Sequence, residues 1–118
     1  LREANEEYVA ELVAKARAII DSKRFGDEVD IHPRAAADLL AHTDYLSDVS
    51  LPAALRFIEA FQGVLEQLRH FPESGAPSKR DSRLRIVRRD GYQFLYTYEI
   101  ETGAVLMEIR SARMAGAD

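Results

Sequence analysis

The chain of 118 residues has room for one domain with a modest core. Its residues are 47% hydrophobic and 31% charged, as in a globular protein, and no apolar run approaches the roughly 18 residues of a membrane helix. The absence of cysteine excludes disulfides and thiolate zinc sites and suits a cytoplasmic protein, while the net charge of −4 argues against tight non-specific binding to nucleic acid.

A long helix is predicted near the start of the chain, from Asn5 to Arg24. Apolar residues recur there at helical spacing between Tyr8 and Ile20, and Gly26 is the expected C-cap. The stretch DEVDIH, residues 27–32, then alternates between polar and apolar, which predicts a short strand. Pro33 ends this strand and opens the next helix.

Two further helices, joined by a short turn, are predicted to form an antiparallel hairpin. The first covers residues 34–47. The second follows Ser50, its expected N-cap, and carries a broad apolar stripe from Ala54 to Leu68. The stretch FPESGAPS cannot continue a helix and is predicted to be a loop.

Three strands are predicted to close the chain, at residues 84–89, 92–100 and 105–110. RDGY and ETG supply the tight turns between them, which predicts an antiparallel meander. Because successive side chains of a strand face opposite sides, we expect two sets. The set facing the helices is Leu84, Ile86, Phe94, Tyr96, Tyr98, Val105, Met107 and Ile109. The opposite set is Arg85, Val87, Arg89, Gln93, Leu95, Thr97, Leu106, Glu108 and Arg110.

The second of these faces mixes cations with aliphatic residues, although the chain as a whole is acidic. Residues 73–118 carry eight Lys and Arg against seven Asp and Glu, whereas residues 1–72 carry eight against thirteen. A face that exposes Arg85, Leu95, Leu106 and Arg110 is typical of a partner-binding surface. We therefore expect this face to carry the function.

The order of strand, helix hairpin and three-stranded meander resembles the RelE/ParE superfamily of bacterial type II toxins, closest to its ParE-like branch. The resemblance rests on VDIHPRAAADLLAHTDYL, PAALRFIEAFQGVLEQLRHFPESGAP, LRIVRRDGYQFLYTY and VLMEIRSARM, in that order. It implies an α+β fold in which an antiparallel sheet of about four strands carries an α-helical hairpin on one face. It also implies a toxin domain over residues 27–118, with residues 1–26 as an added N-terminal helical extension.

The resemblance implies a toxin that arrests growth by binding a macromolecular target, with DNA gyrase as the expected one, and that a cognate antitoxin neutralises. No cofactor is expected, and a homodimer or a hetero-oligomer with the antitoxin is left open. The expected target-binding residues are Arg83, Arg85, Arg89, Arg110, Arg113 and Tyr92. The expected antitoxin-binding residues are Leu95, Leu106, Arg85 and Arg110.

The alternatives are a RelE-like enzyme that cuts ribosome-bound messenger RNA without a metal, and a degenerate member that only binds its antitoxin. For RNA cleavage, the charge of the phosphate would be stabilised by Lys79, Arg80, Arg83, Arg85 and Arg110. The histidine that many family members carry near the end of the last strand is replaced here by the stretch Arg110 to Arg113. Proton transfer would then fall to a tyrosine or to Glu108, because arginine stays protonated.

No metal site is expected, because His32, His42 and His70 are not spaced for one helix face. The N-terminal helix leaves three roles open, since its apolar stripe must be buried somewhere. It packs on its own domain, forms a dimer contact, or acts as an antitoxin-like segment within the same chain.

Overall fold

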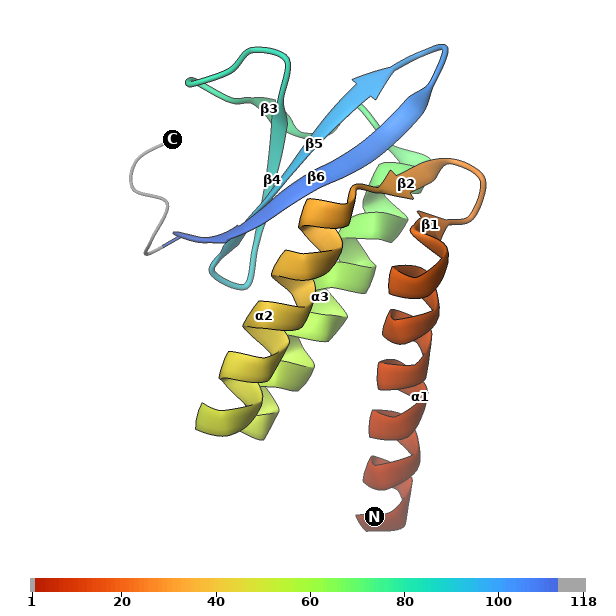
Figure 1. The fold of residues 1–118 in the computed structure, drawn as a ribbon, viewed down its shortest axis with the longest axis vertical. Coiled ribbons are helices and arrows are strands. Elements are labelled where there is room, and N and C mark those ends of the chain that lie inside the picture. The colour runs from red at the N-terminus through yellow and green to blue at the C-terminus, as the bar shows by residue number, and fades with distance from the viewer. Residues whose placement is uncertain (1, 113–118) are drawn as a thin grey trace.

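The computed structural model describes residues 2–112, with side chains from residue 6, as three helices and six strands (Figure 1). The helices are α1 (Arg2–Ser22), α2 (Pro33–Val49) and α3 (Leu51–His70). The strands are β1 (Arg24–Phe25), β2 (Val29–Ile31), β3 (Ala76–Pro77), β4 (Arg85–Arg89), β5 (Tyr92–Glu99) and β6 (Gly103–Ser111).

The strands form one sheet in the order β1-β2-β6-β5-β4-β3. The strand β2 runs parallel to β6, and the other pairs are antiparallel. The α+β fold and the three-stranded meander are confirmed. The sheet has six strands where about four were expected, because the two-residue strands β1 and β3 extend its edges.

The predicted helix hairpin is confirmed, and its ends follow from capping chemistry. The Nδ1 atom of His32 accepts a hydrogen bond from the Arg34 backbone at 3.0 Å, and Pro33 occupies the first turn of α2. Ser50 joins the helices, because its backbone N–H bonds the Leu46 carbonyl and its hydroxyl accepts from the first turn of α3. In Figure 1 this hairpin lies under one face of the sheet.

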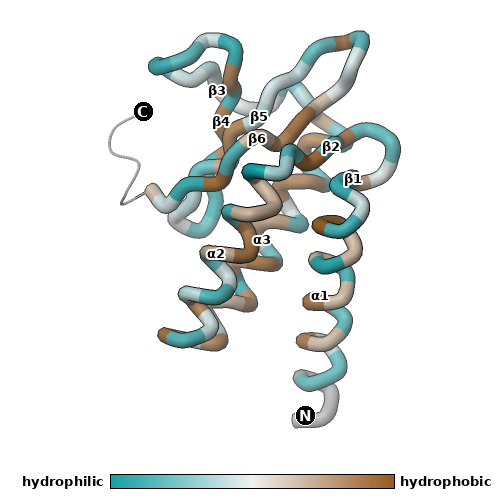
Figure 2. Tube along the Cα trace, in the orientation of Figure 1, coloured by the Kyte–Doolittle hydropathy of each residue, from teal (hydrophilic) through white to brown (hydrophobic). Residues whose placement is uncertain are grey.

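The main core lies between that helix hairpin and the sheet. Its fully buried aromatic residues are Phe57 and Phe61 from α3 and Phe94 and Tyr96 from β5. The expected core positions of the two β5 residues are therefore confirmed. Figure 2 shows the apolar segments of α2, α3 and the strands facing one another.

The strand β4 has the opposite orientation from the one expected. Val87 pairs with Phe94 and lies in the main core, whereas Ile86 pairs with Leu95 on the other face. Ile86 and Val87 are both apolar, so alternation alone cannot decide which one points inward. The register decides it, and the two-residue turn at Asp90 and Gly91, both with positive φ, fixes that register.

The strand β6 changes phase along its length, which strict alternation did not anticipate. Its pairing with β5 shifts between Leu95 and Tyr96, so that one extra residue, Met107, stands between the partners of these two. Such a β-bulge lets Leu106 and Ile109, three residues apart, both point into the core. Leu106 is fully buried there.

The N-terminal helix packs on its own domain. Leu12 and Ala16 bury against Ile58 of α3, and the Gln62 amide donates to the Leu12 carbonyl at 3.2 Å. Of the three roles considered from the sequence, own-domain packing is the one these contacts support. Gly26 is not the C-cap, because α1 ends at Ser22 and Gly26 lies in the turn between β1 and β2.

Across residues 2–112, the helices all fall short of the length and apolar character needed to cross a membrane.

Candidate functional site

The sheet face opposite the helices, here called the outer face, is defined by cross-strand register. Its residues are Ile86 and Arg88 of β4, Gln93 and Leu95 of β5, and Glu108 and Arg110 of β6. Gln93 pairs with both Arg88 and Arg110, and Leu95 pairs with both Ile86 and Glu108. The outer face thus combines an aliphatic centre with polar and charged neighbours.

An ion network on β6 links this face to α2. The Oε2 atom of Glu108 lies 3.3 Å from Nη2 of Arg34 and 3.3 Å from Nε of Arg110. The side chains of Glu108 and Arg110 are only 19% and 24% exposed, so they are partly shielded from water. Such shielding strengthens the attraction between the charges relative to a fully exposed pair.

Two polar atoms of the outer face are buried without a hydrogen-bond partner in the described part of the chain. They are Oε1 of Gln93 and Nε of Arg110, which stand on cross-strand partners. The 3.3 Å separation from Glu108 places Arg110 in ion-pair range, without the geometry of a hydrogen bond. Since buried polar groups in native proteins are almost always satisfied, this pair is a candidate binding feature.

A cleft of about 740 Å³ opens beside this network. Its walls are the start of α2, the loop before β4, the end of β5 and β6. Its charged lining residues are Arg34, Asp81, Arg83, Arg85, Glu99 and Glu108. The structure therefore brings two of the predicted basic side chains, Arg83 and Arg85, near one opening together with Arg34. Acidic side chains lie among them.

Arg83 lies in the loop before β4, where it forms a two-point contact with Asp81. The distances are 3.0 Å from Nε to Oδ1 and 2.9 Å from Nη2 to Oδ2. The hydrogen bonds from the Arg83 side chain and backbone lower the pKa of the Asp81 carboxyl. This arginine lines the cleft as a neutralised pair rather than as a free cation.

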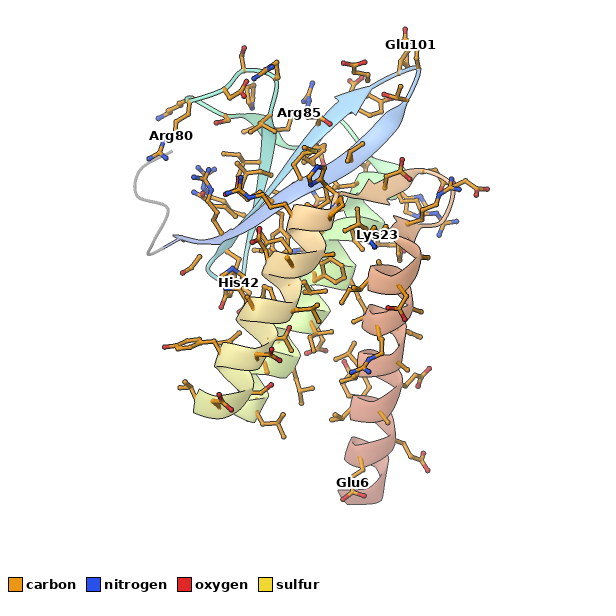
Figure 3. The ribbon with its side chains drawn as sticks, in the orientation of Figure 1. Glu6, Lys23, His42, Arg80, Arg85 and Glu101 are labelled. Atoms are coloured by element: carbon orange, nitrogen blue, oxygen red, sulfur yellow. The ribbon has the colours of Figure 1, made fainter. Side chains whose placement is uncertain are left out.

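Arg85 lies on the helix side of the sheet, not on the outer face as expected, because it follows the corrected orientation of β4. Its Nη1 atom donates to the carbonyls of Glu73 at 2.9 Å and Gly75 at 3.1 Å (Figure 3 labels Arg85). Its strand partner Tyr96 donates to the Pro72 carbonyl at 2.7 Å. Arg85 therefore holds the loop after α3 in place while it borders the cleft.

Arg89 and Tyr92 also lie on the helix side, at the other end of β4 and β5. Arg89 donates through Nη2 to the Gln67 side chain at 3.0 Å, above Gly63 of α3, where any larger residue would meet its guanidinium. Tyr92 packs against Phe57, with ring centroids 4.5 Å apart. Burial raises the pKa of the Tyr92 hydroxyl. Neither residue shares the cleft.

The two leucines expected on an exposed partner surface are both buried. Leu106 points into the core because of the β-bulge, and Leu95 stands on the outer face with 1% of its surface exposed. The expected exposure of these two leucines is therefore wrong, whereas their role as antitoxin contacts stays a prediction. Arg113 lies outside the described residues.

The histidines make structural contacts. His32 caps α2, His42 lies 3.1 Å from the Ile109 carbonyl, and His70 lies 2.8 Å from Glu66 on the same helix. Within residues 2–112 there is no group of three His, Asp or Glu side chains arranged to hold a metal ion.

Neither Arg34 nor the buried Oε1 atom of Gln93 was predicted from the sequence as part of a site. A signal for Arg34 exists, because Arg34, Asp38 and His42 recur every fourth residue on a helix predicted to face the sheet. No sequence signal identifies Gln93, since its burial depends on the assembled face.

Comparison with known proteins places this chain in a family. The family model described as "ParE toxin of type II toxin-antitoxin system, parDE" matches residues 29–116. The chain therefore belongs to this family, and it is a toxin of the type II toxin-antitoxin class. No curated protein sequence matches it.

Two solved structures are similar. One is the chromosomal ParDE toxin-antitoxin system from P. aeruginosa, with 20% identity, a TM-score of 0.60, and coverage of 71% of this chain and 94% of that one. The other is the toxin-antitoxin complex RelBE2 from Mycobacterium tuberculosis, with 23% identity, a TM-score of 0.49, and coverage of 71% and 95%. At this identity the first likeness shows the shared fold.

Proposed function

We propose that this toxin arrests growth in the cytoplasm by binding a protein target, DNA gyrase, at the cleft and the adjacent outer face. The residues of the proposed contact are Arg34, Arg83, Arg85, Glu108 and Arg110. A cognate antitoxin neutralises the toxin by covering the same surface. Residues 27–118 form the toxin domain, and residues 1–26 are an extension that stabilises α3.

The observation that carries this proposal is the pairing of the basic side chains with acceptors of the same chain. Arg83 is held by Asp81, Arg85 by two backbone carbonyls, and Arg110 by Glu108. Binding to nucleic acid draws its affinity from cations that neutralise phosphates, and here the carboxylates beside Arg83 and Arg110 reduce the positive charge available for that. A surface of paired charges instead suits a protein partner with its own charge pattern.

The RNA-cleaving alternative has less support from the same geometry. A general base must reach a proton and be free to take it. The Oε2 atom of Glu108 is already engaged by two guanidinium groups, and burial raises the pKa values of Tyr92 and Tyr96 rather than lowering them. These residues are therefore poorly prepared to accept the proton of a ribose hydroxyl at neutral pH.

The proposed antitoxin contact rests on the family and on the P. aeruginosa neighbour, which is a toxin-antitoxin system by its own description. Because Leu95 and Leu106 are buried, we propose this contact at Arg85 in the cleft and at Arg110 on the outer face beside it. Leu84 and Met107, both part of the cleft lining, supply the apolar component.

Induced expression in bacteria tests the proposal. We expect growth arrest, inhibition of gyrase supercoiling with accumulating cleaved DNA, and no ribosome-dependent cuts by primer extension on messenger RNA. Arg110→Ala and Arg85→Ala should abolish the arrest, whereas the exposed Arg56→Ala on α3 should not. Circular dichroism would establish that each variant is folded.

Three outcomes would contradict the proposal in different ways. Messenger RNA cuts would favour the enzyme, and arrest that persists in both arginine variants would place the effector surface elsewhere. A folded protein that binds its antitoxin yet arrests nothing would favour the degenerate member.

A further inference from the structure

Three polar residues of α2, here called the polar ridge, contact two consecutive residues of β6, Glu108 and Ile109. Arg34, Asp38 and His42 are spaced four apart, so they stand above one another on one side of the helix. Arg34 contacts the Glu108 carboxylate, and Asp38 and His42 both contact the backbone of Ile109. Figure 3 labels His42 on α2, below the sheet.

This ridge replaces a missing strand at the edge of β6. The strand β2 ends at Ile31, paired with Leu106, because Pro33 turns the chain into α2. Beyond that point the Ile109 N–H donates to Oδ2 of Asp38 at 3.0 Å, and the Ile109 carbonyl lies 3.1 Å from Nε2 of His42. Because a carbonyl can only accept, Nε2 of His42 must carry a proton.

The contacts of the ridge with Glu108 and Ile109 lie directly after the β-bulge at Met107. A bulge changes the direction of the side chains that follow it, and an unsupported bulge can move along the strand. With Ile109 fixed inward at 1% exposure, its neighbours Glu108 and Arg110 must point to the outer face. Arg34 then adds a direct contact to Glu108, which in turn lies beside Arg110.

We propose that Asp38 and His42, together with Arg34, are positioning residues that hold Glu108 and Arg110 in the arrangement the outer face uses to bind its target. This inference rests on the proposed function for its biological readout. Its structural content stands on the contacts of α2 with β6.

The variants distinguish the loss of a hydrogen bond to Ile109 from a general loss of folding. Asp38→Leu removes the acceptor for the Ile109 amide, whereas Asp38→Asn keeps a side-chain oxygen that can accept. His42→Leu removes the donor, and His42→Gln places an amide N–H near the position of Nε2. Asp48→Leu, at an exposed position of the same helix, is the matched control.

The first measurement is nuclear magnetic resonance of the purified protein. In Asp38→Leu we expect amide exchange at Ile109 to speed up at least tenfold and the Arg110 Nε–H resonance to shift. Asp38→Asn, His42→Gln and Asp48→Leu should stay close to wild type. An unchanged Arg110 resonance in folded Asp38→Leu and His42→Leu would overturn the proposal and leave the ridge a purely structural support.

The second measurement is growth arrest, with a double-mutant cycle. Asp38→Leu should raise the inducer concentration needed for arrest at least tenfold. In an Arg110→Lys background, which keeps the charge but not the guanidinium and should weaken the arrest without abolishing it, Asp38→Leu should have no additional effect. Independent, additive effects would overturn the proposal. If the wild-type protein causes no arrest, the proposed function fails, and the resonance of Arg110 still decides whether the ridge positions it.

Discussion

Replacing Leu106 by alanine tests which way β6 faces, because strict alternation places this side chain on the outer face and the structure places it in the core. It is fully buried, opposite Ile31 of β2 and Tyr96 of β5. Three carbons are lost, at about 0.8 kcal/mol each from burial alone. With the cavity left behind, we expect a total loss of about 3–5 kcal/mol.

The assay is urea unfolding followed by circular dichroism, with the exposed Leu40→Ala on α2 as control. For a slope of about 1.5 kcal/mol/M, Leu106→Ala should lower the unfolding midpoint by roughly 2–3 M without changing the slope. Leu40→Ala should stay within about 1 kcal/mol of wild type, because its side chain is half exposed. A loss below about 0.5 kcal/mol in Leu106→Ala would refute the β-bulge argument and return Leu106 to the outer face.

Three further predictions follow from single contacts. Ser50→Ala should cost about 1 kcal/mol in urea unfolding, since the hydroxyl caps α3, and Ser50→Asp should restore most of that loss. The pKa of Tyr96 is raised mainly by burial, so its contribution to stability is present below about pH 10 and is lost as the pH rises through its higher folded value. Absorbance titration at alkaline pH should show this late ionisation, and Tyr96→Phe should reduce its amplitude by one tyrosine, with that of Tyr92 remaining, while the bond to Gly75 is lost. The pKa of Asp81 is lowered by Arg83, so this pair stabilises the folded state at a pH above the ordinary carboxyl pKa. That stabilisation is lost as the pH falls through the lower pKa of the folded state. Arg83→Ala should return the carboxyl titration to its ordinary range by nuclear magnetic resonance, and an unchanged titration would contradict the contact.

Much of the fold could be predicted from local patterns. Pro33, Ser50 and the apolar stripes located the hairpin, and Asp90-Gly91 located the turn between β4 and β5. The same turn also sets the register, because a two-residue turn pairs Arg89 with Tyr92 and hence Val87 with Phe94. The orientation of β4 was therefore available in the sequence, although alternation of apolar residues alone does not reveal it.

The candidate site was less predictable, because its basic residues are separated by the sheet itself. Arg85 and Arg89 share the helix side with the core, while Arg110 lies on the outer face. Arg85 donates to the backbone carbonyls of Glu73 and Gly75, and Arg89 donates to the side chain of Gln67. Arg110 is paired with Glu108, and the β-bulge sets the direction of both side chains. Counting cations along the chain therefore overstated the free positive charge of this surface.

The sequence by itself determined the elements, their order and the family, because helix stripes, caps and turns depend on residues within a few positions of one another. Only the tertiary structure decided which side chains of β6 point into the core and which cations are paired. A single extra residue, Met107, reverses the phase of β6, and the polar ridge of α2 holds that reversal in place. The reversal arises in the pairing of β5 with β6, whereas the ridge joins segments about 70 residues apart, and no local pattern records such a contact.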